Sequence, residues 1–420
     1  MKYTTSLRPW VSRRIEKIGT ADLVIGIPCY NNQSTIEHVV KCVSDGLHIH
    51  YPDKRSLIMI SDGGSTDDTR DVAQTLTVYP FIEKIVQIYR GDPGKGSALR
   101  SIFEAASFLE VKACAVIDSD LRSITSAWVP ALIQPVLEGN FHFVAPLYTR
   151  YKYDGTITNT IVYNLTRALF GRRIRQPIGG DFGLSGELAR YYSSHGEWDS
   201  DIARFGIDIW MTLTPIVRKL PICQSYLGTK IHDVKDPGES LGPMFRQVIF
   251  TLFLLMDRYY EFWSGIGPSD PVPIFGEPGY GEPDAFAIDT SRMIRIYKEG
   301  FAHFGVFWQQ VLRPENYDLL KRLSQMSEDE FYLSTEVWSK IVYDYSATFH
   351  AWERHRRQLV DTMSPLYYAR VASFVSKTQG MTNEEAEEVI EDQAQQFEVL
   401  KPYLLEGWAR RSLPGPDQSF

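Results

Sequence analysis

Short apolar runs alternate with segments of helical pattern from residue 22 to about residue 147, and this alternation limits the folds that the chain can adopt. The runs that predict buried strands are Leu23–Ile27, Ser56–Ile60, Ile85–Ile88 and Ala113–Ile117. Each run is followed by a loop and then by a stretch that predicts a helix. Alternating strands and helices of this length predict an α/β fold with a parallel, doubly wound, Rossmann-like sheet.

Three of the loops also carry signals for the start of a helix. Ser34 and Glu37 have the spacing of a capping box, in which each side chain bonds the backbone at the other position. Ser65 stands before acidic residues that suit the first turn of another helix. Gly94-Lys95-Gly96 leads into a third predicted helix.

The fourth apolar run ends directly in Asp118-Ser119-Asp120. In an open α/β sheet, ligands bind outside the carboxyl ends of the strands, so both carboxylates are expected at a binding crevice. Proteins typically hold Mg²⁺ by one or two carboxylates, and substrate phosphates complete its shell. The pair therefore predicts a site for Mg²⁺ or Mn²⁺ and for the diphosphate of a nucleotide.

Loops after the other runs add candidate ligand contacts. Pro28-Cys29-Tyr30-Asn31-Asn32 follows the first run, where a base and ribose could rest, and Asp62-Gly63 follows the second, where Asp62 could bond either group. Each of these two loops alone could equally be an ordinary strand-to-helix turn. Lys95 lies between two glycines at a helix start, where backbone amides and the helix dipole favour anions, although the spacing of a Walker loop is absent.

Composition limits the classes of function and location. The chain of 420 residues is 44% hydrophobic and 23% charged, and its net charge of −8 argues against general nucleic-acid binding. Its four cysteines lack a CxxC pair, which suits a reducing compartment and no zinc site. No signal peptide is visible, and the most apolar stretch, Val248–Met256, is far short of the roughly 20 residues that span a bilayer. We therefore expect a cytoplasmic protein without a transmembrane segment.

The pattern changes along the chain and predicts three parts. These are an N-terminal segment (residues 1–21), the domain that carries the alternation (22–240) and a mainly helical C-terminal region (241–420). Strand signals vanish from about residue 290, and Met381–Leu400 has helical periodicity. Gly267–Pro283, which is dense in glycine and proline, predicts a connecting loop.

A series of motifs in fixed order resembles the GT-A glycosyltransferases, in which a DxD such as Asp118 and Asp120 is the metal signature. The motifs are Pro93-Gly94-Lys95-Gly96, Asp118-Ser119-Asp120-Leu121, Pro146-Leu147-Tyr148-Thr149-Arg150, Gln176-Pro177-Ile178-Gly179-Gly180, Phe205-Gly206-Ile207-Asp208, Lys230-Ile231-His232 and Phe245-Arg246-Gln247-Val248-Ile249. The series is similar to that of retaining enzymes that make glucosyl-3-phosphoglycerate, with kinship to mannosylglycerate synthases. It covers about residues 22–260, and we find no comparable resemblance for the helical end.

The resemblance implies a role for individual residues. Asp120 and His232 match the metal ligands of the family. The residues that match nucleotide contacts are Pro28, Cys29, Tyr30, Asn32, Gly63, Lys95 and Asp118. The residues that match the sugar or acceptor pocket are Arg150, Thr158, Gln176, Ile178, Gly179, Gly180 and Asp208. The roles nearest the reaction fall to Lys95, to Asp208 and to Ile178, whose carbonyl matches a group near the anomeric carbon.

Several of these residues also have ordinary structural explanations. His232 could be a loop histidine, and Asp208 could cap the helix that follows it. The basic residues Arg172, Arg173 and Arg175 could form an anion pocket or a solvated turn.

The chain departs from the glucosyl-3-phosphoglycerate enzymes in its acceptor motifs. Where those enzymes carry a glycine-rich GGRVT stretch that holds the acceptor phosphate, this chain has Thr158–Tyr163, and Val234 replaces the asparagine after the metal histidine. Asp154–Thr158 is closer to the mannosylglycerate pattern. The acceptor could therefore be D-glycerate, 3-phosphoglycerate or another small hydroxy acid.

Taken together with the metal and nucleotide motifs, the resemblance implies a metal-dependent, retaining glycosyltransferase. It would move glucose or mannose from a nucleotide diphosphate sugar to a small anionic acceptor, as in compatible-solute synthesis. A homodimer is expected because the family commonly forms one. Two alternatives stay open: a polyprenyl-phosphate sugar synthase, for which Val248–Trp263 could serve as an interfacial helix, and a catalytically silent nucleotide-sugar-binding scaffold.

Overall fold

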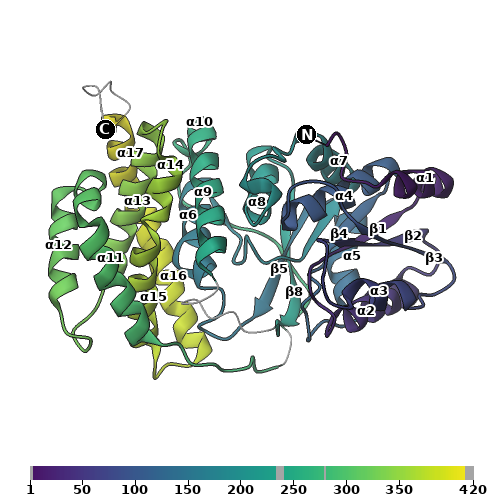
Figure 1. Cartoon of the computed structure of the whole chain (residues 1–420), viewed down its shortest axis with the longest axis horizontal. Coiled ribbons are helices and arrows are strands. Elements are labelled where there is room, and N and C mark those ends of the chain that lie inside the picture. Colours follow the sequence, from purple (N-terminus) through teal and green to yellow (C-terminus); the bar gives the residue numbers. More distant parts are fainter. Residues whose placement is uncertain (1–2, 233–240, 279–280, 412–420) are drawn as a thin grey trace. The chain divides into compact units, whose positions relative to one another are not determined.

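The computed structural model describes every residue except 1–2, 233–240, 279–280 and 412–420, so the departure at Val234 lies outside the described residues (Figure 1). The chain forms two compact units. The first comprises Met1–Arg150, Ile174–Val234 and Pro271–Asp284, and the second comprises Tyr151–Arg173, Lys235–Asp270 and Ala285–Phe420. Both units are assembled from separate segments, and the predicted limits at residues 21 and 240 stay a prediction.

An eight-stranded sheet in the order β10-β8-β5-β7-β4-β1-β2-β3 forms the centre of the first unit. Its strands are β1 (Leu23–Cys29), β2 (Ser56–Asp62), β3 (Ile82–Ile88), β4 (Ala113–Val116), β5 (Phe143–Thr149), β7 (Phe182–Ser185), β8 (Ile222–Thr229) and β10 (Ile274–Phe275). Neighbouring strands run parallel except at β7, which is antiparallel to both β4 and β5. The predicted α/β class is confirmed, and the sheet is parallel as predicted except at β7.

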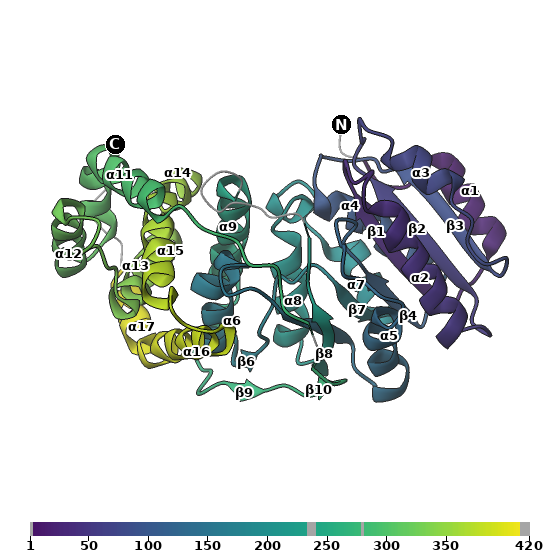
Figure 2. The same cartoon turned by 90° about the horizontal axis from the view of Figure 1, so that it is seen from below.

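Helices cover both faces of this sheet (Figure 2). They are α1 (Pro9–Ile18), α2 (Ile36–His50), α3 (Thr69–Thr75), α4 (Lys95–Phe108), α5 (Trp128–Gly139), α7 (Gly186–His195), α8 (Ile207–Val217) and a short 3₁₀ turn, η2 (Asp201–Ala203). Side chains of β1 alternate between the two layers. Ile25 belongs to the core that includes α2 and α5, whereas Gly26 faces α4, where a Cβ would overlap the side chain of Ile102. Because both faces are covered, every residue of β1 and β2 is buried.

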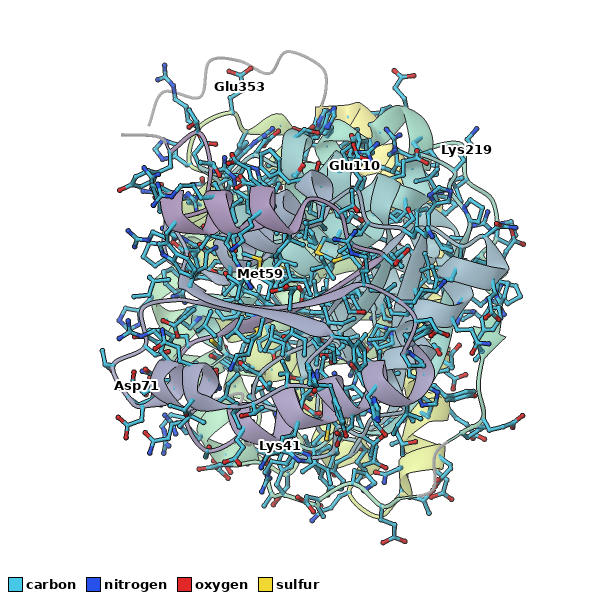
Figure 3. All side chains as sticks on the ribbon, turned by 90° about the vertical axis from the view of Figure 1, so that its right-hand side faces the viewer. Lys41, Met59, Asp71, Glu110, Lys219 and Glu353 are labelled. Atoms are coloured by element: carbon cyan, nitrogen blue, oxygen red, sulfur yellow. The ribbon has the colours of Figure 1, made fainter. Side chains whose placement is uncertain are left out.

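Figure 3 shows the same layering from the side of the first unit. Met59 lies within the sheet, and Lys41 lies on the outer side of the helix layer that includes α2. Because helices cover the faces of the sheet, a ligand can reach the strands only at their ends. In open α/β sheets, ligands bind at the carboxyl ends of the strands.

Three local predictions were wrong. The predicted capping box at Ser34 and Glu37 does not form: α2 begins after Thr35, which makes no side-chain cap and instead donates its hydroxyl to the Ser119 carbonyl, at 2.6 Å. The helix expected at Ser65 begins only at Thr69. The predicted connecting loop contains β10, which pairs in parallel with β8.

The second unit is helical apart from the short segments β6 (Arg172–Arg173) and β9 (Asp270–Pro271) in the described part of the chain. Its helices are a π-helix, η1 (Thr158–Val162), followed by α6 (Tyr163–Phe170), α9 (Gly242–Arg258), α10 (Tyr260–Trp263), α11 (Thr290–Val311), α12 (Pro314–Gln325), α13 (Thr335–Ala351), α14 (Arg356–Asp361), α15 (Ser364–Thr378), α16 (Asn383–Val399) and α17 (Lys401–Arg411). The predicted helical C-terminal region is confirmed. None of the described helices has the length and apolar character needed to cross a membrane.

We predict that Gly183→Ala destabilises the first unit by about 1–3 kcal/mol, because overpacking of a filled core costs energy of this size. Gly183 pairs with Ala115 on one side and Val144 on the other, and a Cβ there would overlap the Leu132 carbonyl of α5. Chemical denaturation measures the change. Gly265→Ala is the matched control, since nothing lies within 4 Å of its Cβ position; equal losses in the two variants would contradict the packing argument.

Candidate active site

The end of β4 and the starts of α4 and α8 bring together three predicted site residues. The Lys95 Nζ atom lies 2.8 Å from Asp118 Oδ1 and 3.2 Å from Asp208 Oδ2. Lys95 is the first residue of α4, and Asp208 lies in the first turn of α8. Residues separated by more than one hundred positions along the chain thus form one charged cluster.

The glycines around Lys95 allow this approach. Gly94 has a φ of +155°, and a Cβ on Gly96 would overlap the backbone carbonyl of Ile202. Neither position accepts a larger residue without movement of the backbone. The two glycines therefore let the start of α4 lie against η2 with Lys95 directed to Asp118.

A second lysine approaches the other oxygen of Asp118. Lys230 follows β8, and its Nζ atom lies 3.4 Å from Asp118 Oδ2, 2.8 Å from Asp181 Oδ2 and 2.8 Å from the Gly179 carbonyl. Asp181 also accepts the backbone N–H of Asp118 at 2.7 Å and the hydroxyl of Tyr148. The Lys230 side chain is 4% exposed, and the Asp181 side chain is fully buried.

The charges in the cluster control one another. Burial alone would lower the pKa of Lys95 and of Lys230, but Asp118 and Asp208 outweigh it at Lys95, and Asp181 and Asp118 outweigh it at Lys230, so both pKa values are raised. Both lysines are therefore charged at neutral pH. Burial raises the pKa of Asp181 against the opposing effect of Lys230, and burial raises the pKa of Asp208 against that of Lys95.

Asp208 keeps one oxygen available for a ligand. Its Oδ1 atom is buried and has no hydrogen-bond partner among the described residues, although Oδ2 contacts Lys95. A buried acceptor without a donor is costly, and a bound hydroxyl group would satisfy it. The first-turn position of Asp208 also suits the helix dipole of α8; α8 has no side-chain cap at Gly206, so capping does not account for Asp208.

The segments that carry the two predicted metal ligands, Asp120 and His232, are joined by backbone hydrogen bonds. Leu121 and His232 form an antiparallel bridge, and the Arg122 N–H donates to the Ile231 carbonyl at 2.9 Å. His232 is one member of this bridge, and Asp120 directly precedes the other member, Leu121. No cluster of three or more His, Cys, Asp or Glu side chains suited to a metal occurs in the described residues. Two protein ligands fit a Mg²⁺ or Mn²⁺ ion whose shell is completed by phosphate and water.

The predicted nucleotide loop lies against the centre of the DxD. The Ser119 hydroxyl donates to Asn32 Oδ1 at 2.7 Å, and the Tyr30 N–H donates to the same oxygen at 2.9 Å. The Gly63 N–H donates to the Cys29 carbonyl at 2.8 Å, and a Cβ on Gly63 would lie 3.2 Å from the Tyr30 ring. The structure thus brings together most of the residues predicted to contact the nucleotide. Tyr30 among them is 58% exposed, and Pro28 lies near the end of β1.

Asp62 is engaged with its own loop. Its Oδ1 accepts the N–H groups of Gly64 and Ser65, and its Oδ2 accepts the Ser65 hydroxyl. Asp62 is also fully buried. These bonds favour a role in shaping the loop, and direct contact between Asp62 and a base or ribose stays a prediction.

The predicted sugar-pocket loop is held from two sides. Gln176 exchanges hydrogen bonds with the backbone of Tyr148, at 3.2 Å and 3.0 Å, and the Gly179 N–H donates to the Gln176 carbonyl at 3.0 Å. Gly180 has a φ of +95°, and a Cβ there would overlap Asp118 Oδ2. Ile178, which lies between Gln176 and Gly180 in this loop, is half-buried. The Arg150 guanidinium lies 5.2 Å from the centre of the Tyr148 ring.

The remaining predicted residues lie elsewhere or outside this cluster. Thr158 belongs to the second unit, where it is 6% exposed in the π-helix η1. Arg172 and Arg173 also belong to that unit and are exposed; Arg172 forms an ion pair with Asp270 at 3.3 Å. Their part in acceptor binding stays a prediction.

Sequence reasoning missed Asp181, Lys230 and Tyr148 as site residues. Each lies inside or directly next to a motif that was already identified: Asp181 follows Gly180, Lys230 is the first residue of the motif that ends at His232, and Tyr148 lies within Pro146–Arg150. The available signal was an acid and a base beside or within these motifs, although the strands next to them, β7 and β8, were not predicted. The pairing of this acid and base across 49 residues was not visible in the sequence.

Comparisons with known proteins found one family model and several solved structures that are similar to this chain. Residues 24–184 match the model of the family described as glycosyl transferase family 2. Two similar solved structures are of glucosyl-3-phosphoglycerate synthase from Mycobacterium tuberculosis. The one with Mn²⁺, uridine diphosphate and glucosyl-3-phosphoglycerate is 25% identical, covers 60% of this chain and 87% of its own, and has a TM-score of 0.44. The one with Mn²⁺, UDP-glucose and phosphoglyceric acid is 26% identical, with coverages of 65% and 96% and a TM-score of 0.44. No curated protein matches the sequence.

We predict that Gly180→Ala lowers turnover about 100-fold, because a Cβ at this position displaces the Asp118 carboxylate and small misplacements in a site cost about that much. The positive φ of Gly180 adds a stability cost of about 1–2 kcal/mol. Gly19→Ala is the control for that cost, because Gly19 has a φ of +79° and no atom lies within 4 Å of its Cβ position. Thermal unfolding and turnover are measured for both variants; an equal loss of turnover would refute the displacement of Asp118 as the cause.

Proposed function

We propose that this GT-A glycosyltransferase, whose family 2 segment spans residues 24–184, moves a hexose from a nucleotide diphosphate sugar to a small hydroxy acid with retention at the anomeric carbon. The observation that carries the proposal is the charged cluster at the strand ends. It places Asp118, Lys95 and Asp208 in contact, beside the paired segments of Asp120 and His232.

In this proposal, the nucleotide lies on the loops after β1 and β2. Tyr30 and the backbone at Gly63 contact the base and ribose, and Asn32 keeps the DxD loop against them through Ser119. Lys95 directs its ammonium group to the diphosphate, since its charge is maintained and the site is already fixed around it. Asp120 and His232 would hold a Mg²⁺ or Mn²⁺ ion, which neutralises charge on the leaving diphosphate when bound.

The transfer needs no covalent intermediate on the protein. The acceptor hydroxyl approaches the anomeric carbon from the face of the leaving group, the bond from that carbon to the phosphate oxygen breaks, and the new carbon–oxygen bond forms. The acceptor proton passes to the phosphate oxygen that leaves. The chain contributes mainly position and electrostatics: the Ile178 carbonyl near the anomeric carbon, and Asp208 Oδ1 as an acceptor for a hydroxyl of the sugar or acceptor.

The proposed acceptor is a small hydroxy acid that carries a carboxylate. Arg150 would bind a carboxylate, which both D-glycerate and 3-phosphoglycerate carry. Thr158 and its neighbours replace the stretch that holds the acceptor phosphate in the enzymes that the sequence resembles, and Thr158 is buried. We therefore propose a hydroxy-acid acceptor that carries a carboxylate. The cytoplasmic location and the homodimer stay predictions.

The central test is a product assay with Mg²⁺ that crosses UDP-glucose, GDP-glucose and GDP-mannose with D-glycerate and 3-phosphoglycerate. We expect one donor to transfer its hexose to at least one of these acids, with the product in the same anomeric configuration as the donor. Mass spectrometry and proton NMR identify the product. Donor hydrolysis without transfer to either acid, or a product of inverted configuration, would contradict the proposal.

Removal of the metal should abolish transfer, and added Mn²⁺ or Mg²⁺ should restore it. Asp120→Ala and His232→Ala should each lower kcat/KM by at least about 100-fold. The loss of a residue that only hydrogen-bonds a metal ligand already costs up to about 100-fold in metal affinity or activity, and the loss of the ligand itself should cost at least as much. His142→Ala is the control for a lost histidine, since His142 contacts Ser185 outside the cluster. Activity of His232→Ala equal to that of His142→Ala would show that His232 is only a loop histidine.

A further inference from the structure

Asp181 connects four segments of the site through one carboxylate. Its Oδ1 accepts the backbone N–H of Asp118, and its Oδ2 accepts the Lys230 ammonium and the Tyr148 hydroxyl. Asp118 follows β4, Lys230 follows β8, and Tyr148 lies near the end of β5. Asp181 itself lies directly before β7. We infer that Asp181 is a positioning residue for the transfer reaction, an inference that rests on the proposed function.

Asp181 cannot act by touching the substrate. Its side chain is fully buried, and both of its oxygens already accept protein donors. Its effect on a bound donor sugar therefore has to pass through the groups that it holds. Those groups are the backbone of the DxD loop and the ammonium group of Lys230.

Lys230 transmits the position of Asp181 to two parts of the site. From Asp181, its ammonium group reaches Asp118 Oδ2 at 3.4 Å and the Gly179 carbonyl at 2.8 Å. Asp118 belongs to the DxD, and Gly179 belongs to the loop assigned to the sugar pocket. The Asp181–Lys230 pair thus fixes the separation between the diphosphate side and the sugar side of the site.

Stability alone is a weak reason for such a pair. Burial of two charges is costly before their attraction is counted, and well-packed apolar residues often replace buried pairs without loss of stability. An ion pair that also bonds a backbone N–H and a loop carbonyl defines geometry that an apolar pair cannot define. This argument assigns Asp181 to orientation of the site.

Asp181→Asn tests the inference with little change of volume. The amide oxygen can still accept the Asp118 N–H, but the amide NH₂ then faces the donor groups of Lys230 and Tyr148. We expect kcat/KM for the donor sugar to fall about 100-fold, as expected for a misplaced site, and UDP affinity with Mn²⁺, measured by calorimetry, to fall about 10-fold. KM for the acceptor should change less than twofold.

Asp344→Asn is the matched control. Asp344 is a buried carboxylate of the second unit that accepts the Arg313 N–H at 3.0 Å, the Asn316 amide at 2.7 Å and the Tyr403 hydroxyl at 2.9 Å. Its removal costs stability in a similar way but should leave UDP affinity and kcat/KM for the donor unchanged. If Asp181→Asn weakens UDP binding no more than Asp344→Asn does, Asp181 is only structural and the inference fails.

A double variant tests whether Asp181 acts through Lys230. If Asp181 acts through Lys230, the double variant Asp181→Asn with Lys230→Met should bind UDP no more weakly than Lys230→Met alone. Losses that multiply would overturn this route. UDP binding decides the inference even if the acceptor has been misassigned, whereas a wild-type protein that binds UDP–Mn²⁺ but transfers no hexose would contradict only the proposed function.

Discussion

Alternating charges at the ends of β4 and β8 are the interaction on which the candidate site depends. Lys95, Asp118, Lys230 and Asp181 follow one another at 2.8 Å, 3.4 Å and 2.8 Å. Each member is needed by its neighbours, because a buried ion without a partner costs far more than a paired one. The row explains why the strand-end loops, the start of α4 and the segment after β8 adopt one arrangement.

Under the proposed function, this row of charges also prepares the site for the diphosphate of the donor. Three carboxylates, those of Asp118, Asp181 and Asp208, share two ammonium groups, so the cluster holds its lysines in place before any diphosphate arrives. Donors that are fixed in advance need no reorganisation when charge develops, which is the main electrostatic advantage of a protein site over water. The same contacts keep both lysines charged, since the neighbouring aspartates raise the pKa of each.

Features that depend on local sequence were predictable, and features that depend on long-range pairing were not. The apolar runs of β1 and β2 and the glycines around Lys95 predicted the strands and the strand-end loops. The capping box at Ser34 failed because the Thr35 hydroxyl bonds Ser119, which is 84 residues away. β10 was missed because this two-residue strand is defined by its pairing with β8, which is remote in sequence. Asp181 was missed because its partner Lys230 is also remote in sequence. The helices after residue 290 were expected, because strand signals vanish there and Met381–Leu400 has helical periodicity, whereas η1 and α6 of the second unit were not predicted.

The donor and acceptor halves of the proposed function differ in how far the fold determines them. The residues assigned to the nucleotide, the metal and the sugar loop all belong to the first unit, and their geometry follows from strand ends, paired backbone and close glycine contacts. Thr158, which falls where the sequence departs from the enzymes it resembles, belongs to the second unit and is buried in a π-helix. π-Helical turns are uncommon and frequently accompany functional sites. Because the contacts among Lys95, Asp118, Lys230 and Asp181 do not involve the residues assigned to the acceptor, the same donor machinery is compatible with more than one hydroxy acid.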